Sequence, residues 1–162
     1  MGRVWKFGDN VNTDLITPGR YNLTTNPTEL AKYCFCEVRP EFPKEVHLGD
    51  FVVGGVHFGS GSSRETAPLA IKASGIKAII ASSFARIFYR NAVNIGLPIL
   101  IADTSVINDG DQLDVDLRSG VISIPESGIK IDAQGLPEFL LAIMDEGGIV
   151  AYLNKYKKFP NP

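Results

Sequence analysis

The stretch best suited to chemistry is a run of glycines and serines, GSGSSRET, at residues 59–66. It follows the apolar run 51–58 and precedes a helical pattern from Ala67 to Ser74, so a strand, a glycine-rich turn and a helix start should meet there. Free backbone N–H groups and the positive end of a helix dipole make such a turn a natural anion site. Arg64 adds a planar guanidinium suited to a carboxylate or a phosphate.

The same letters also have a purely structural interpretation. Ser62 and Glu65 fit the S-x-x-E capping box, in which the serine caps the helix and the glutamate reaches back to it. The stretch lacks the third glycine of a dinucleotide-binding turn, the Gly-Lys-Ser/Thr of a P-loop and the G-x-S-x-G elbow of serine hydrolases. Local sequence therefore leaves anion binding and simple capping both open.

Composition is that of an ordinary globular protein. The 162 residues carry 16 basic and 18 acidic side chains, a net charge of −2, and no basic run indicates nucleic acid. No apolar run approaches the roughly 20 residues of a membrane span, and no signal peptide opens the chain. We therefore predict one cytoplasmic domain, residues 1–162, that binds neither nucleic acid nor membrane.

The sequence contains no set of side chains spaced for a metal. Its two cysteines, Cys34 and Cys36, would point to different sides of a helix, and its histidines are His47 and His57. These residues match neither a zinc nor an iron–sulfur pattern, so we expect no metal in this chain. On an exposed helix the cysteines could link isolated chains in air, although buried, inert thiols are the commoner case.

Five segments in succession alternate between strand and helix patterns: 51–53, 67–74, 77–81, 84–94 and 98–101. This order implies right-handed crossovers and a parallel sheet, in which ligands bind beyond the carboxyl ends of the strands. Residues 59–64 are expected at that edge.

Other segments flank this parallel unit. The predicted elements are a first strand at 3–7, a polar loop at 8–20, a helix from Asn26-Pro27 to about Cys36, a hairpin of 112–117 and 121–124, a helix at 137–146 and a last apolar segment at 149–153. The predicted fold is α/β, with a parallel βαβαβ unit and a late β-hairpin.

Three blocks in this order resemble the small, swivelling subunit of the aconitase-type hydro-lyases. They are residues 8–18 (GDNVNTDLITP), 59–65 (GSGSSRE) and 82–91 (SSFARIFYRN). The similarity covers nearly the whole chain and is strongest to small subunits of 3-isopropylmalate dehydratases, in their short archaeal or bacterial form. It implies a swivelling β/β/α domain and a reaction that moves a hydroxyl between adjacent carbons of a malate-type substrate.

The resemblance also implies roles for residues of the second block. Ser62 would remove the carbon-bound proton, and Ser63 and Arg64 would bind the substrate, with Arg64 on a carboxylate. Such a serine needs the N–H groups of the turn, the helix terminus and Arg64 to lower the pKa of its hydroxyl.

Neighbouring residues are expected to shape the site. Thr13 and Asp14 would form its loop, and Arg86 and Arg90, one helical turn apart, would either pair with acidic neighbours or face a partner. Thr66 stands where the family often has histidine, so the role of that histidine is vacant here or taken by the partner.

A loop of four residues, Tyr21, Asn22, Leu23 and Thr24, is expected to select the substrate. In the resembling family this loop lies near the variable substituent, and homoaconitase-type subunits carry Tyr-Leu-Arg-Thr there. Leu23 stands at the arginine position, where it would contact an isopropyl group rather than a carboxylate. Alternatively, Leu23 packs on the domain as an ordinary loop residue, or Arg20 supplies a cation that permits dual specificity.

The resemblance further implies a large partner subunit that carries a [4Fe–4S] cluster, without which this chain would be inactive. The substrate would be a small dicarboxylate: isopropylmalate first, methyl-substituted malates next and homoaconitate-type acids last. A non-catalytic, anion-binding regulatory domain and a purely structural subunit are the alternatives from other classes.

Overall fold

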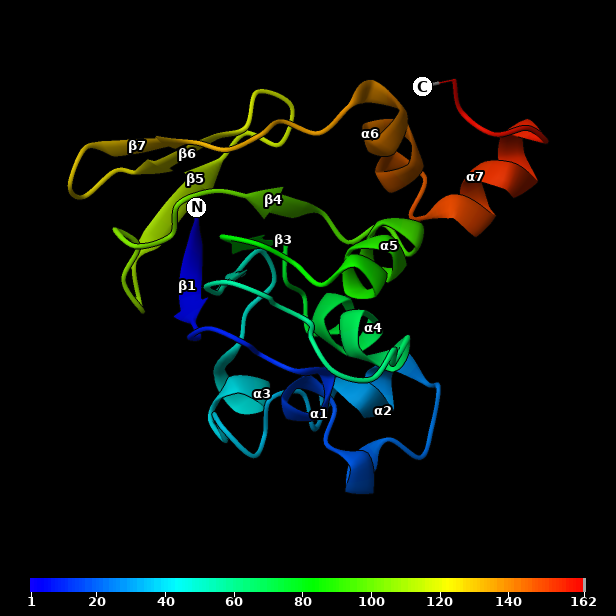
Figure 1. The fold of residues 1–162 in the computed structure, drawn as a ribbon, viewed down its shortest axis with the longest axis horizontal. Helices are drawn as coiled ribbons and strands as arrows, with labels where there is room; N and C mark the ends of the chain where they lie inside the picture. The colour runs from blue at the N-terminus through cyan, green and yellow to red at the C-terminus, as the bar shows by residue number, and fades with distance from the viewer. Residues whose placement is uncertain (162) are drawn as a thin grey trace.

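A computed structural model describes residues 1–161, which form one seven-stranded sheet of order β4-β3-β2-β1-β5-β6-β7 (Figure 1). The strands are β1 Gly2–Lys6, β2 Phe51–Val53, β3 Ala78–Ala81, β4 Ile99–Ile101, β5 Gln112–Val115, β6 Val121–Ile124 and β7 Ile129–Asp132. The helices are α1 Thr13–Ile16, α2 Pro27–Ala31, α3 Phe42–Glu45, α4 Thr66–Ala73, α5 Arg86–Asn94, α6 Glu138–Asp145 and α7 Ile149–Tyr156, with a 3-10 turn η1 at Gly19–Tyr21. None of these helices is long and apolar enough to cross a membrane. Pro162, the last residue of the predicted domain, lies outside the described residues.

The predicted parallel unit and late hairpin are both confirmed. Val52 of β2 lies opposite Ile79 of β3, and Ile79 lies opposite Ile99 of β4, all in parallel register. β1 joins this set in parallel with β2, and it pairs antiparallel with β5 on its other side. The hairpin β5–β6 gains a third antiparallel strand, β7, that the sequence analysis did not predict.

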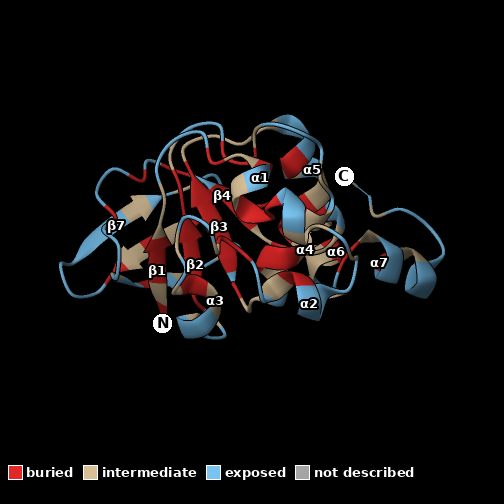
Figure 2. Ribbon diagram, turned by 90° about the horizontal axis from the view of Figure 1, so that it is seen from below, coloured by how far each residue is buried: buried red, intermediate tan, exposed pale blue. Residues whose placement is uncertain are grey.

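The parallel strands separate two packed layers because successive side chains point to opposite faces. One face carries Trp5, Val52 and Ile79 into a cluster with α4 and α5. The other carries Val4, Phe51 and Ile80 into a cluster with Leu113 of β5 and Ile122 of β6. Buried residues accordingly fill the strands in the middle of Figure 2, with helices on one side and the β-hairpin on the other. This is the expected β/β/α arrangement.

The helix that begins at Asn26 is shorter than predicted. The Asn26 side chain caps its first turn as expected, but α2 ends at Ala31 and turns follow. Phe35 has a left-handed backbone (φ 56°), is fully buried and stacks on Phe7 with ring centroids 4.1 Å apart. Packing of Phe35 in the core thus overrides local helix propensity, and Cys34 is buried beside it rather than on an exposed helix.

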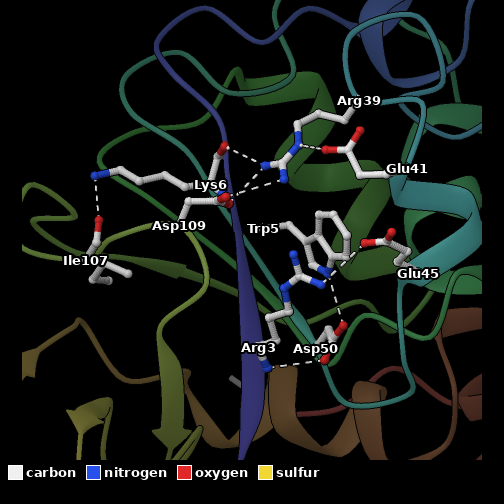
Figure 3. Close-up of polar contacts among 9 residues, drawn as sticks. All are labelled: Arg3, Trp5, Lys6, Arg39, Glu41, Glu45, Asp50, Ile107 and Asp109. Carbon is white, nitrogen blue, oxygen red and sulfur yellow. Dashed lines mark hydrogen bonds and ion pairs between the residues drawn. The ribbon is translucent and has the colours of Figure 1, made fainter. Parts of the chain in front are cut away.

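Polar side chains hold β1 in place on the helical side of the sheet (Figure 3). Asp50 is only 4% exposed, and its carboxylate accepts hydrogen bonds from Trp5 Nε1 (3.0 Å) and from the Arg3 backbone N–H (3.2 Å). Further along, Arg39 lies 4.9 Å above the Trp5 ring and pairs with Asp109 at 2.9 Å. These contacts fix the strand that leads directly into the loop 8–17.

Candidate functional site

The turn between β2 and α4 lines a cavity of about 200 Å³. Its polar lining residues are Thr13, Ser62, Ser63, Arg64, Arg86 and Asn91. The three sequence blocks each contribute to this list, so the fold brings together segments that are far apart in the chain. The cavity follows the carboxyl end of β2, where the sequence analysis expected a ligand site.

Two glycines of the turn adopt a left-handed backbone conformation that residues with a side chain rarely adopt. Gly59 and Gly61 have φ values of 85° and 92°. The N–H of Gly59 donates to the Val11 carbonyl at 2.7 Å, and the N–H of Thr13 donates to the Ser60 carbonyl at 2.9 Å. The turn is therefore bonded directly to the loop that leads out of β1.

Ser62 lies next to Thr13 at the start of α1. The Thr13 hydroxyl donates to the Ser62 carbonyl at 2.8 Å, and its oxygen lies 3.3 Å from Ser62 Oγ. Thr13 is only 2% exposed, whereas Ser62 and Ser63 are exposed to the cavity. The N–H groups of Ser62 and Ser63 have no acceptor within residues 1–161, so they are free to meet an anion.

The capping-box interpretation of this turn is wrong. The N-cap of α4 is Glu65, and within the described chain no side chain makes a cap hydrogen bond there. Ser62 lies too far before the helix because the backbone between Ser62 and Thr66 forms an extra turn, with the Arg64 N–H bonded to the Ser62 carbonyl at 2.9 Å. The Ser62 side chain is thus not used for helix capping.

The Arg64 side chain is bound by two residues of the loop 8–18, Asp14 and Thr17. Its Nη1 donates to Asp14 Oδ1 at 2.9 Å and to the Thr17 carbonyl at 2.7 Å, and Asp14 Oδ1 also accepts from the Gly19 N–H at 3.1 Å. Both partners of the guanidinium within residues 1–161 bind Nη1, so Nη2 and Nε remain for a ligand. Asp14 therefore orients the planar fork, as expected of a loop-shaping residue.

The two arginines of α5 form no ion pair within residues 1–161, so of the two alternatives for them the pairing with acidic neighbours is wrong. Both are exposed, and Arg86 also borders the cavity next to Ser62 and Ser63. A second cation is therefore available at the same opening. Asn91, five residues beyond Arg86, lines the cavity too and was not among the predicted site residues.

The loop with Leu23 projects outward beside this site. Leu23 is 86% exposed, so the alternative that it packs on the domain is wrong. Tyr21 stacks on Tyr33 with ring centroids 4.2 Å apart, and Arg20 pairs with Glu37 at 2.9 Å. Leu23 does not line the Ser62 cavity; it lies in a separate, shallow depression with Thr66.

The residues of this chain do not fit an iron–sulfur cluster. Such clusters are held by several cysteine thiolates. Burial raises the pKa of the Cys34 thiol, and partial burial together with the charge of Glu37 raises the pKa of Cys36. Residues 1–161 also bring no three His, Cys, Asp or Glu side chains together in a group that could hold a metal ion.

Comparisons with known proteins show the family to which the chain belongs. Residues 10–104 match the family model of the aconitase C-terminal domain. The 3-isopropylmalate dehydratase small subunit 2 of Archaeoglobus fulgidus is 54% identical over 96% of this chain and 95% of its own. An isopropylmalate/citramalate isomerase small subunit of Methanocaldococcus jannaschii is 51% identical over 95% and 93%. A crystal structure of 3-isopropylmalate dehydratase from the same organism superposes with a TM-score of 0.92 at 50% identity, covering 96% of this chain and 93% of that one.

Proposed function

The chain belongs to the aconitase C-terminal-domain family, among the small subunits of 3-isopropylmalate dehydratase, and we propose that it supplies proton-abstracting and substrate-binding residues to that enzyme. The observation that carries this proposal is the cavity shared by Ser62, Ser63 and Arg64. The chain is thus a hydro-lyase subunit of leucine biosynthesis. The continuous sheet supports treating residues 1–162 as one swivelling domain.

The reaction removes a proton from one carbon and a hydroxyl from its neighbour, and then returns them in exchanged positions. We assign the proton to Ser62 Oγ, which is exposed to the cavity and has Thr13 Oγ1 at 3.3 Å. To serve as a base, this oxygen would need its negative charge stabilised, a role that we propose for the free N–H groups of the turn and the cation of Arg64. Arg64 would hold a substrate carboxylate through the edge that Asp14 leaves open.

A small subunit has a larger partner, and we propose that the partner carries the [4Fe–4S] cluster, since the side chains of this chain do not fit one. The substrate would be a small dicarboxylate bound between the two subunits. Two free cysteines suit the reducing cytoplasm, and the isolated chain could self-associate through surfaces that the partner normally covers.

The test is reconstitution from purified subunits. Dehydratase activity on isopropylmalate should appear only when the chain is mixed with its matching large subunit. A large subunit that is fully active alone would favour a regulatory domain. Activity that needs this chain but tolerates loss of the Ser62 hydroxyl would favour a purely structural subunit.

Replacing Arg64 by lysine tests the carboxylate contact. Arg64→Lys keeps the charge but loses the fork that reaches Asp14 and a ligand together, so kcat/KM should fall by about 2 kcal/mol, roughly 30-fold. Steady-state kinetics of the assembled enzyme measure this loss, with Lys130→Arg, a distant exchange of the same two residue types, as the control. A near-normal Arg64→Lys enzyme would remove Arg64 from the site.

Substrate choice is assigned to Leu23, whose exposed side chain would contact the substituent of the substrate. Isopropylmalate should be preferred, and methyl-substituted malates should follow, as the name of the isopropylmalate/citramalate isomerase relative suggests. Homoaconitate-type acids would come last, because an apolar side chain cannot compensate a third carboxylate. Arg20 forms an ion pair with Glu37, which argues against the alternative that Arg20 supplies a cation for a third substrate carboxylate.

The variant Leu23→Arg should move selectivity toward homoaconitate. We expect the ratio of kcat/KM for homoaconitate over isopropylmalate to rise at least about tenfold, some 1.4 kcal/mol. The measurement is a direct competition between both substrates in the assembled enzyme. Leu48→Arg, at another highly exposed leucine (93%), is a matched control that should leave the ratio unchanged. An unchanged ratio in Leu23→Arg would place specificity elsewhere.

A further inference from the structure

One hydrogen bond joins the loop of residues 21–24, to which we assign substrate choice, to α4, the helix that follows the turn with Ser62. The Thr66 hydroxyl donates to Asn22 Oδ1 at 2.8 Å, across a sequence separation of 44 residues. In the described part of the chain it is the only hydrogen bond between residues 21–25 and residues 59–73. Both residues are partly buried, so water competes with the bond less than at an open surface.

The Thr66 hydroxyl is free for this contact because the helix does not use it. Thr66 is the first residue of α4, whereas the N-cap position is Glu65. Threonine hydroxyls can bond to nearby backbone groups, but here the only hydrogen bond of the Thr66 hydroxyl within residues 1–161 goes to the loop. The bond therefore serves the loop rather than the helix.

The Asn22 N–H closes the turn η1 on the Gly19 carbonyl at 3.2 Å, and within residues 1–161 its side chain is bonded to Thr66 alone. Tyr21 is held by stacking on Tyr33, and the Thr24 hydroxyl accepts from the Asn26 N–H at 3.0 Å. Between these anchored points stands Leu23, whose side chain is highly exposed. An exposed leucine keeps one orientation only if the backbone beside it is held, and Asn22 is the adjoining residue.

We propose that Thr66 is a positioning residue for substrate selection: its hydroxyl holds Asn22 and so fixes Leu23 where the substituent of the substrate binds. The inference rests on the proposed role of Leu23 in the dehydratase. Arg64, two residues earlier, binds the Thr17 carbonyl, four residues before this loop begins. Residues at the start of one helix would thus have two roles: Arg64 would bind a substrate carboxylate, and Thr66 would position the side chain that contacts the substituent.

The expected effect follows from the strength of one neutral hydrogen bond, which shifts an equilibrium about two- to tenfold. In the assembled enzyme, Thr66→Val should lower kcat/KM for isopropylmalate about fivefold, mainly through KM, because the positioned Leu23 contributes to binding rather than to proton transfer. For citramalate, whose methyl group reaches Leu23 less, the loss should stay below about twofold. The ratio between the two substrates is the decisive quantity.

Three further variants separate the hydrogen bond from general damage. Thr66→Ser retains the hydroxyl and should restore both the KM and the ratio. Thr28→Val makes the same exchange on the exposed surface of α2 and should change neither. Asn22→Ala should reproduce Thr66→Val, and the double variant should be no worse than either single one, because both remove the same bond.

A second readout does not depend on activity. Backbone 15N order parameters of residues 22–25 in the isolated chain should fall in Thr66→Val and Asn22→Ala but not in Thr66→Ser or Thr28→Val. If the reconstituted wild-type enzyme does not turn over isopropylmalate, the proposed function fails while the order parameters still decide whether Thr66 anchors the loop. Unchanged order parameters, or an unchanged substrate ratio in an active Thr66→Val enzyme, would overturn the inference.

Discussion

The assembled enzyme carrying Ser62→Ala should lose about 10²–10⁴-fold in kcat for isopropylmalate, the range associated with a positioned acid–base group. The hydroxyl is the group to which we assign the carbon-bound proton, and alanine leaves the cavity without an acceptor at that position. Substrate affinity should change far less, because Ser63 and Arg64 remain in place. The measurement is single-turnover kinetics of the complex.

Ser60→Ala is the matched control for this experiment. Ser60 lies in the same turn and bonds to Thr13 through its backbone carbonyl, but it does not line the cavity. The Ser60→Ala enzyme should therefore retain near-normal kcat, and both variants should bind the large subunit like the wild type. A Ser62→Ala complex with more than about a tenth of normal kcat would contradict the assignment of Ser62 as the base.

Much of the fold is predictable from the sequence because the parallel unit has strong local signals. The runs 51–53 and 78–81 are buried in the structure without a break, and both helices after them end at glycines with positive φ, Gly75 and Gly96. The three sequence blocks likewise identify the segments that line the cavity.

The features that the sequence analysis missed depend on contacts between distant residues. β7 is largely exposed and exists because it pairs along its length with β6. The early end of α2 follows from burial of Phe35, which no helix pattern shows. Ser62 fits a capping box locally, yet its position is set by Thr13, 49 residues earlier. Local propensity is a weak guide wherever such tertiary contacts decide the geometry.

Gly59 is the residue of the turn whose replacement should damage the protein most. Its φ of 85° disfavours any side chain, and a Cβ placed there would overlap the ring of Phe88, which is buried at the start of α5. The backbone strain costs about 1–2 kcal/mol and the overpacking about 1–3 kcal/mol more. We therefore expect Gly59→Ala to lower the free energy of unfolding of the isolated chain by about 2–5 kcal/mol, measured by urea denaturation.

Gly61→Ala separates the two causes, because its φ of 92° is similar but the nearest atom to an added Cβ is Asn12 Cβ at 3.4 Å. The free energy of unfolding of Gly61→Ala should therefore fall only by the cost of backbone strain, about 1–2 kcal/mol. In Gly59→Ala, the second change Phe88→Ala should recover part of the stability, because it removes Cγ and Cδ2, two of the three Phe88 atoms that the added methyl group overlaps. Phe88→Ala alone destabilises the protein. Equal losses in the two glycine variants, or no recovery in the double variant, would show that close packing against α5 does not require glycine at position 59.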